Sequence, residues 1–290
     1  MKTAVLTDSA SYISPELANK YNITVLPITI IFGNQEYRDA VDISAEEFLQ
    51  KMASEKQLPS TAQVTMHQMQ EAFDDLAAKG YQEVICINLS SGITSFYSNL
   101  VNYSKTVKKI KVFPFDSKIA SAGEADLTFL AARMAQNGEN AKTIMPKLLQ
   151  LRDSIHVCLV VDDLSHLVRT GRISNTSAFF GNLLKIKPML TFNEEGKIVP
   201  LDKARTMGQA LIKIGNLIKN KPADPELTQR ISVVNAGDQN NSQRWEDKLR
   251  VEFPEAKFSN NQISPAITVH TGEKAMGVLW DIDWQTLSKK

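Results

Sequence analysis

The chain alternates short apolar runs rich in Val and Ile with longer segments that have the periodicity of amphipathic helices. This alternation is typical of parallel strands joined by crossover helices, so the sequence predicts an α/β fold with mainly parallel sheets. Its 290 residues and apolar fraction of 43% are enough for two compact cores. The expected strands cover residues 3–7, 23–32, 83–89, 111–115, 156–161, 188–192, 197–201, 231–235 and 266–270.

Local signals then divide the chain into two parts. Capping boxes beginning at Ser44 and Thr65 predict helices in the first half. The run Asn-Glu-Glu-Gly at residues 193–196 lies between two apolar runs and predicts a hairpin, a feature that the first half lacks. We therefore expect two α/β domains, residues 1–155 and 156–290, with a ligand cleft between them.

Charge and cysteine content exclude several classes of protein. Lys and Arg total 33 against 32 for Asp and Glu, so the net charge of +1 gives no basic field for nucleic acid. Cys86 and Cys158 lie inside apolar runs, where a thiol is a small core residue. No run has the length of a signal peptide core or a membrane span. We expect a cytoplasmic protein that binds no nucleic acid.

Three polar turns lie next to expected strands in the first half, at residues 7–11, 58–65 and 90–95. An open α/β sheet places its ligands at such strand ends. The third turn combines Gly92 with several hydroxyls at a helix start, which is a ready anion site. Ordinary helix capping explains the same residues equally well, so both interpretations stay open.

Two residues of the second half have side chains suited to an anion. His270 closes the expected strand 266–270 and precedes Thr271, so its ring should emerge at a strand end beside a turn. Arg172 follows Gly171, which should end a short helix, and its guanidinium could hold a carboxylate or phosphate at two points. A solvated surface arginine is the alternative.

Motifs that would supply chemistry are missing from the sequence. HExxH, CxxC, GxSxG and Walker patterns do not occur, and no Asp, Glu and His residues have metal-ligand spacing. We expect no catalytic residue, no metal and no cofactor.

Several segments, taken in order, resemble the DegV family across nearly the whole chain. They cover residues 8–9, 59–63, 90–94, 116–118, 162–164 with 170–174, and 270–272. The resemblance implies a two-domain α/β lipid carrier that holds one long-chain fatty acid between its domains. It also implies a non-catalytic subunit, which presents the fatty acid carboxylate to the catalytic subunit of a fatty acid kinase. Transient contact with a membrane would accompany this role.

Carried onto this sequence, the family pattern implies a ligand site for the carboxylate. That site comprises Thr61, Thr94, Ser95, His270, Thr271 and Arg172. We expect Arg172 at the cleft mouth, where it would meet the incoming phosphate or an acidic partner surface. The sequence departs from the family pattern at Ala62, Val64, Phe96, Glu273 and Lys274, and the last three would bring a ring and two charges near the headgroup.

Two other functions remain open. The altered headgroup residues are compatible with a carrier or regulator for another amphiphile. A serine hydrolase could use Ser90, Ser91 or Ser95 with His270 and Asp8, although no nucleophile elbow is present. Apolar residues that could line a tunnel, although most are better explained as core, are Phe179, Phe180, Leu183, Leu184, Ile186, Met189, Leu190 and the helical run 211–218.

Overall fold

A computed structural model describes residues 2–55, 57–162, 164–173, 186–221, 224 and 226–289. Expectations that fall on Asp163, Ser174, Phe179, Phe180, Leu183 and Leu184 lie outside the described residues.

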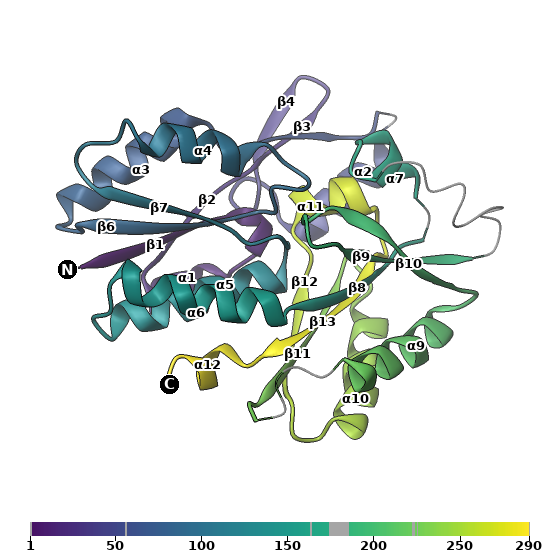
Figure 1. Cartoon of the computed structure of the whole chain (residues 1–290). Helices are drawn as coiled ribbons and strands as arrows, with labels where there is room; N and C mark the ends of the chain where they lie inside the picture. Colours follow the sequence, from purple (N-terminus) through teal and green to yellow (C-terminus); the bar gives the residue numbers. More distant parts are fainter. Residues whose placement is uncertain are drawn as a thin grey trace.

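The first half of the chain builds a parallel sheet with the strand order β2-β1-β6-β7. Apolar side chains cover both faces of this sheet, so α3 and α4 pack on one face while α5 and α6 pack on the other (Figure 1). The capping boxes at Ser44 and Thr65 are both formed and begin α2 and α3. The elements are β1 (Thr3–Asp8), η1 (Ser9–Ser11), α1 (Pro15–Tyr21), β2 (Ile23–Leu26), α2 (Ala45–Ser54), α3 (Met66–Ala78), β6 (Glu83–Asn88), α4 (Phe96–Ser104), β7 (Lys111–Asp116), α5 (Ala122–Gln136) and α6 (Ala141–Ser154).

A small antiparallel sheet extends from the first half, with the order β4-β3-β5. Its strands are β3 (Thr29–Phe32), β4 (Gln35–Arg38) and β5 (Ser60–Ala62). The single strand expected over residues 23–32 is therefore wrong, because the chain leaves the first sheet at Pro27 and enters a different sheet as β3. Proline has no N–H to donate to a strand ladder, which explains the break.

The second half forms a six-stranded sheet with the order β10-β9-β8-β13-β11-β12. The predicted hairpin is present as the antiparallel pair β9 and β10. The α/β class is confirmed, but parallel pairing here is limited to β11 with β12, and the other four pairings are antiparallel. The elements are β8 (His156–Val160), α7 (Ser165–Arg169), β9 (Lys187–Phe192), β10 (Ile198–Ala204), α9 (Met207–Asn220), β11 (Gln229–Asn235), α10 (Gln239–Glu252), β12 (Lys257–Gln262), α11 (Pro265–Thr271), β13 (Met276–Ile282) and α12 (Trp284–Leu287).

The strand expected over residues 266–270 is wrong, because this segment forms the helix α11. Its β-branched residues favour a strand. The preceding Ser264 accepts a hydrogen bond from the Ile267 N–H as the helix N-cap, and Pro265 occupies the first helical turn. His270 therefore lies in the last turn of a helix and does not emerge from a strand end.

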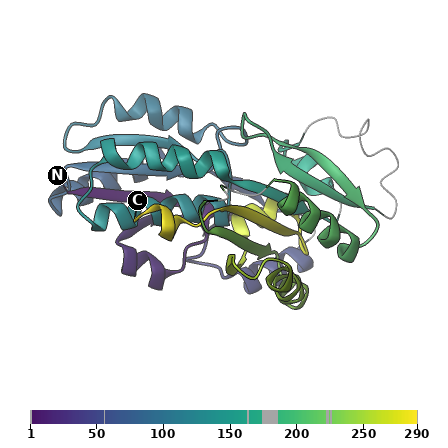
Figure 2. The same cartoon turned by 60° about the horizontal axis from the view of Figure 1, so that its bottom comes forward.

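The two large sheets meet along one continuous apolar core. Buried residues of β1 and β6, such as Val5 and Ile85, belong to the same cluster as Leu159 of β8 and Leu279 of β13. On its other face the second sheet packs against α9 and α10. Figure 2 shows the first-half elements at one end of an elongated molecule and the hairpin of β9 and β10 at the other. The proposed domain boundary at residue 155 falls between α6 and β8.

Candidate ligand-binding site

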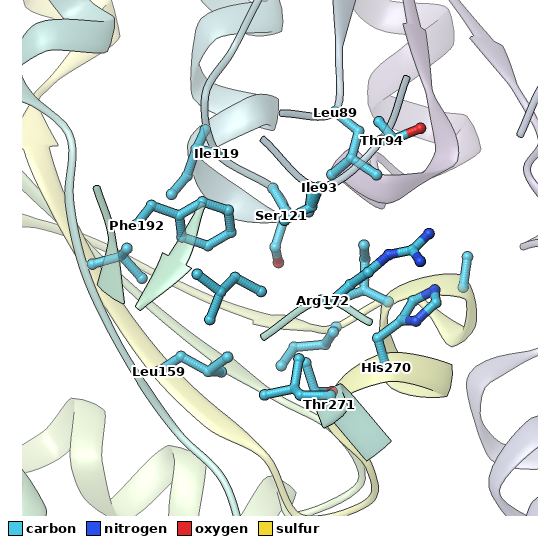
Figure 3. Close-up of a pocket in the computed structure, with 18 of the residues that line it drawn as sticks. Leu89, Ile93, Thr94, Ile119, Ser121, Leu159, Arg172, Phe192, His270 and Thr271 are labelled. Atoms are coloured by element: carbon cyan, nitrogen blue, oxygen red, sulfur yellow. The ribbon is translucent and has the colours of Figure 1, made fainter. Parts of the chain in front are cut away.

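A cavity of about 460 Å³ lies between the two halves of the chain. This volume falls within the range of roughly 300–1,000 Å³ that is typical of small-molecule sites. Thr61, Thr94, Ser95, Arg172, His270 and Thr271, the six residues expected from the sequence, all line this one cavity. Apolar side chains from both halves, among them Ile119, Leu159, Phe192 and Leu279, make up most of the remaining wall (Figure 3).

His270 and Thr61 form the centre of the polar end. Thr61 lies in the middle of β5, and its Oγ1 is 2.9 Å from Nε2 of His270. The helix that carries His270 is anchored by the residue that follows β4, because the buried Asp39 carboxylate accepts a hydrogen bond of 3.4 Å from the Ala266 N–H. Thr61 and His270, which are remote in sequence, are thereby held opposite each other.

The His270 imidazole is neutral at physiological pH. Burial is the main cause, and the positive charges of Arg172 and Arg169 and the nearby His166 add to it, lowering the pKa of His270 to about 3. Among the described residues, Nδ1 of His270 is buried without a hydrogen-bond partner. A neutral ring can donate from one nitrogen and accept at the other, so His270 can orient the Thr61 hydroxyl.

Two arginines place positive charge at this end. Arg172 is half-buried, and its Nη1 donates a 2.6 Å hydrogen bond to the Thr170 carbonyl oxygen. Arg169 is exposed, and its Nη2 donates to the Pro59 carbonyl oxygen at 3.2 Å. Burial lowers the pKa of Arg172 without removing its charge at physiological pH. The guanidinium therefore lies beside the neutral His270 and can attract an anion.

Gln63 is a lining residue that the sequence reasoning did not select. Its Oε1 accepts hydrogen bonds from Thr94 Oγ1 at 3.2 Å and from Ser95 Oγ at 3.4 Å. Gln63 belongs to one of the three polar turns, so the sequence did mark its segment. Its contact with the turn at residues 90–95 arises only in the folded chain, so the sequence could not single it out. Thr271 is buried, and its hydroxyl makes a 3.4 Å hydrogen bond to the Gly272 carbonyl oxygen.

The turn at residues 90–95 serves packing as well as the cavity. Ser90 Oγ donates a 2.7 Å hydrogen bond to the Gly196 carbonyl oxygen in the hairpin of the second sheet. A Cβ on Gly92 would lie 2.2 Å from the Gly196 backbone, so only glycine allows this approach. Packing between the two halves therefore accounts for Ser90 and Gly92, and it is a role that neither open interpretation named, since the N-cap residue of α4, Ser95, makes no side-chain capping hydrogen bond.

The geometry of a serine hydrolase is missing from the described residues. His270 contacts Thr61 and no serine hydroxyl. The Asp8 carboxylate accepts from the Ala10 and Leu89 N–H groups and does not orient His270. No described group of three or more His, Cys, Asp or Glu residues could hold a metal ion.

The sequence departures at Phe96, Glu273 and Lys274 do not reach the cavity. The Phe96 ring is buried in the core beneath α4. Glu273 and Lys274 form an exposed ion pair of 3.8 Å. Of the expected tunnel residues, Met189, Leu211, Ile214 and Ile218 belong to the core under α9 and α10. In the described part of the chain, no helix is long and apolar enough to cross a membrane.

Comparisons with known proteins agree with this arrangement. A family model described as "Uncharacterised protein, DegV family" matches residues 2–283. Protein DegV of Bacillus subtilis is 32% identical over 281 residues, which cover 97% of this chain and 99% of that protein. A crystal structure of that DegV, described as a fatty acid binding protein, superposes with a TM-score of 0.89 at 32% identity, covering 97% of this chain and 99% of the other. A fatty acid binding DegV family protein from Streptococcus agalactiae gives a TM-score of 0.89 at 30% identity, with the same coverage.

Proposed function

Since this chain belongs to the DegV family, we propose that it binds one long-chain fatty acid in the cavity between its two sheets. The observation that carries the proposal is the uneven distribution of polarity in this cavity. Arg172 and His270 lie at one end, and Ile119, Leu159 and Phe192 lie toward the other (Figure 3). Thr61 belongs to the polar end through its 2.9 Å hydrogen bond with His270. This pattern matches a ligand with one anionic group and a long apolar chain.

The polar end supplies what a carboxylate needs. When the neutral His270 ring donates from Nε2 to Thr61 Oγ1, the Thr61 hydroxyl proton is free to donate to the carboxylate. The half-buried Arg172 keeps this end positive without a metal, but the carboxylate does not need it as a direct ligand, so its charge is left for the incoming phosphate. More than ten methylenes of the acyl chain would contribute ~10 kcal/mol of gross stabilisation at roughly 0.8 kcal/mol each, before entropy costs.

We further propose that this chain is a carrier and presents the carboxylate to a partner kinase. The kinase would provide ATP, metal and the transfer chemistry, and this chain would provide position. Arg172, half-buried in the cavity wall, would meet the phosphate that approaches the carboxylate. Such a carrier works in the cytoplasm and touches the membrane only to exchange its ligand.

Displacement of a fluorescent fatty acid by stearic acid tests the binding step. We expect one site per chain, and wild-type protein that binds neither compound would contradict the proposal. Arg172→Ala separates binding from transfer: it should keep most of the affinity for stearic acid but lower acyl phosphate formation with a fatty acid kinase and ATP. Equal losses in both measurements would place Arg172 among the carboxylate ligands.

A further inference from the structure

Ser121 has a backbone conformation that side chains rarely adopt. Its φ is 57° and its ψ is −134°, close to a region that glycine alone normally occupies. It is the N-cap residue of α5, where a serine hydroxyl usually accepts a backbone hydrogen bond, but its side chain makes no such bond. The backbone at Ser121 is therefore strained, and no capping hydrogen bond from the serine side chain offsets this strain.

The surrounding contacts hold this conformation in place. The Ser121 N–H donates to the Ala10 carbonyl oxygen at 3.1 Å. Two residues earlier, the Ile119 carbonyl oxygen accepts from the Ser90 N–H at 3.0 Å and from Ser117 Oγ at 2.9 Å. Two other parts of the first half, at Ala10 and Ser90, together with the local bond from Ser117, thus hold the segment that carries Ser121 and fix the direction of its Cα–Cβ bond.

The Ser121 hydroxyl points into the cavity. Figure 3 shows its oxygen directed into the enclosed space, with Ile119 and Phe192 on one side and Arg172 and His270 on the other. The residue is only 8% exposed, and its hydroxyl makes no hydrogen bond with the described residues. The other polar lining residues of the described chain belong to the segments 61–63, 94–95, 172 and 270–271, which surround the carboxylate end.

We propose that Ser121 is a second polar contact for the ligand and that the preferred ligand is a hydroxylated long-chain fatty acid. This inference rests on the proposed fatty acid site and specifies its substrate class. A hydroxyl on the acyl chain can both donate to and accept from Ser121 Oγ, so it would give this cavity-facing hydroxyl a hydrogen-bond partner that a saturated chain does not offer. The N-terminal end of α5 carries partial positive charge and favours an oxygen atom nearby.

Competition binding with four ligands tests this assignment. Stearic acid, oleic acid and two hydroxystearic acids with the hydroxyl at different chain positions displace a fluorescent fatty acid from wild-type protein, Ser121→Ala and Ser121→Gly. We expect one hydroxystearic acid to bind wild type about tenfold more tightly than stearic acid. Both variants should reduce that ratio to about one while keeping their affinity for stearic acid. Ser54→Ala, an exposed serine at the end of α2, is the matched control and should leave the ratio unchanged.

Three other results would overturn the assignment of Ser121, and each points to a different cause. Equal binding of stearic and hydroxystearic acids by wild type and Ser121→Ala would show that the hydroxyl is not a ligand contact. A preference for oleic acid that disappears in Ser121→Ala would assign Ser121 to a double bond. If wild-type protein binds none of the four acids, the proposed function itself fails.

Discussion

Two arginines at the junction of the two halves, Arg230 buried and Arg172 half-buried, have opposite surroundings. Arg230 donates from Nε and Nη2 to the Asp283 carboxylate at 3.0 and 2.6 Å, and Asp126 lies 3.9 Å away. Arg172 lines the ligand cavity, and its hydrogen bond goes to a backbone carbonyl oxygen. Buried charge that is already paired serves stability, whereas charge that faces a cavity is available for a ligand.

The carboxyl groups around Arg230 add to this contrast. Burial raises the pKa of Asp126 to about 7 and raises the pKa of Asp281 well above its usual value. The Arg230 charge is thus matched inside the cluster by the Asp283 carboxylate. At the ligand end, burial and, after it, the neighbouring positive charges lower the pKa of His270, so the ring stays neutral and the Arg172 charge is left for an anion. Ser121 lines both the ligand cavity and the pocket beside Arg230.

The largest effect should come from removing the paired arginine. Arg230→Leu leaves the Asp283 carboxylate buried without its partner, so we expect a loss of about 3–5 kcal/mol in the free energy of unfolding. Urea denaturation above the raised pKa of Asp126 measures it. Arg172→Leu is the control and should change stability little. Similar losses in both variants would erase the distinction between the two arginines.

Variants at the carboxylate end should weaken ligand binding and not stability, the reverse of the pattern expected for Arg230→Leu. Thr61→Val and His270→Ala each remove a hydrogen-bonding group from the carboxylate end and should weaken fatty acid binding by about 1–3 kcal/mol. The measurement is displacement of a fluorescent fatty acid, with circular dichroism to verify folding. Phe113→Ala, which removes a partly buried ring outside the cavity, serves as the control. Unchanged affinity in both headgroup variants would place the carboxylate elsewhere.

Relief of backbone strain should have a smaller effect. Ser121→Gly removes a strain of roughly 1–3 kcal/mol but adds the backbone entropy of glycine, roughly 0.5–1 kcal/mol. We therefore expect the melting temperature to rise in Ser121→Gly and not in Ser121→Ala, which keeps a Cβ at the same φ of 57°. A melting temperature that falls in Ser121→Gly would argue against strain at this position.

The smallest effect concerns the proton affinity of His270. Arg172 is the largest charge contribution to its low pKa, after burial. A nearby positive charge disfavours a protonated ring, so Arg172→Ala should raise the pKa of His270. NMR titration of the imidazole carbons measures the change, with Arg244→Ala, at an exposed arginine of α10, as the control. An unchanged pKa in Arg172→Ala would separate the two side chains electrostatically.

The sequence predicted much of this molecule, and its errors have physical causes. Hydrophobic periodicity and capping boxes were sufficient for the α/β class and for α2 and α3. The error at residues 266–270 came from reading a β-branched run as a strand, although Ser264 and Pro265 carried a helix-start signal. Parallel pairing was also expected in the second sheet, because strand polarity depends on tertiary connections that apolar runs do not record.

Tertiary contacts explain what the sequence could not supply at the site. The six expected residues lie around one cavity, but Gln63 is identified only by its hydrogen bonds to the next turn. Ser121 gives no local signal, because its conformation is imposed by Ala10 and by the hydrogen bonds that fix Ile119. Their roles as ligand contacts stay predictions.

Native mass spectrometry of protein purified from its host tests the central claim most directly. The intact mass should exceed that of the chain by one long-chain fatty acid, and denaturing extraction should release that acid in a ratio of one per chain. Thr61→Val and His270→Ala prepared in the same way should retain less of it. Wild-type protein that carries no acyl ligand, and takes none up when stearic acid is added, would contradict the account.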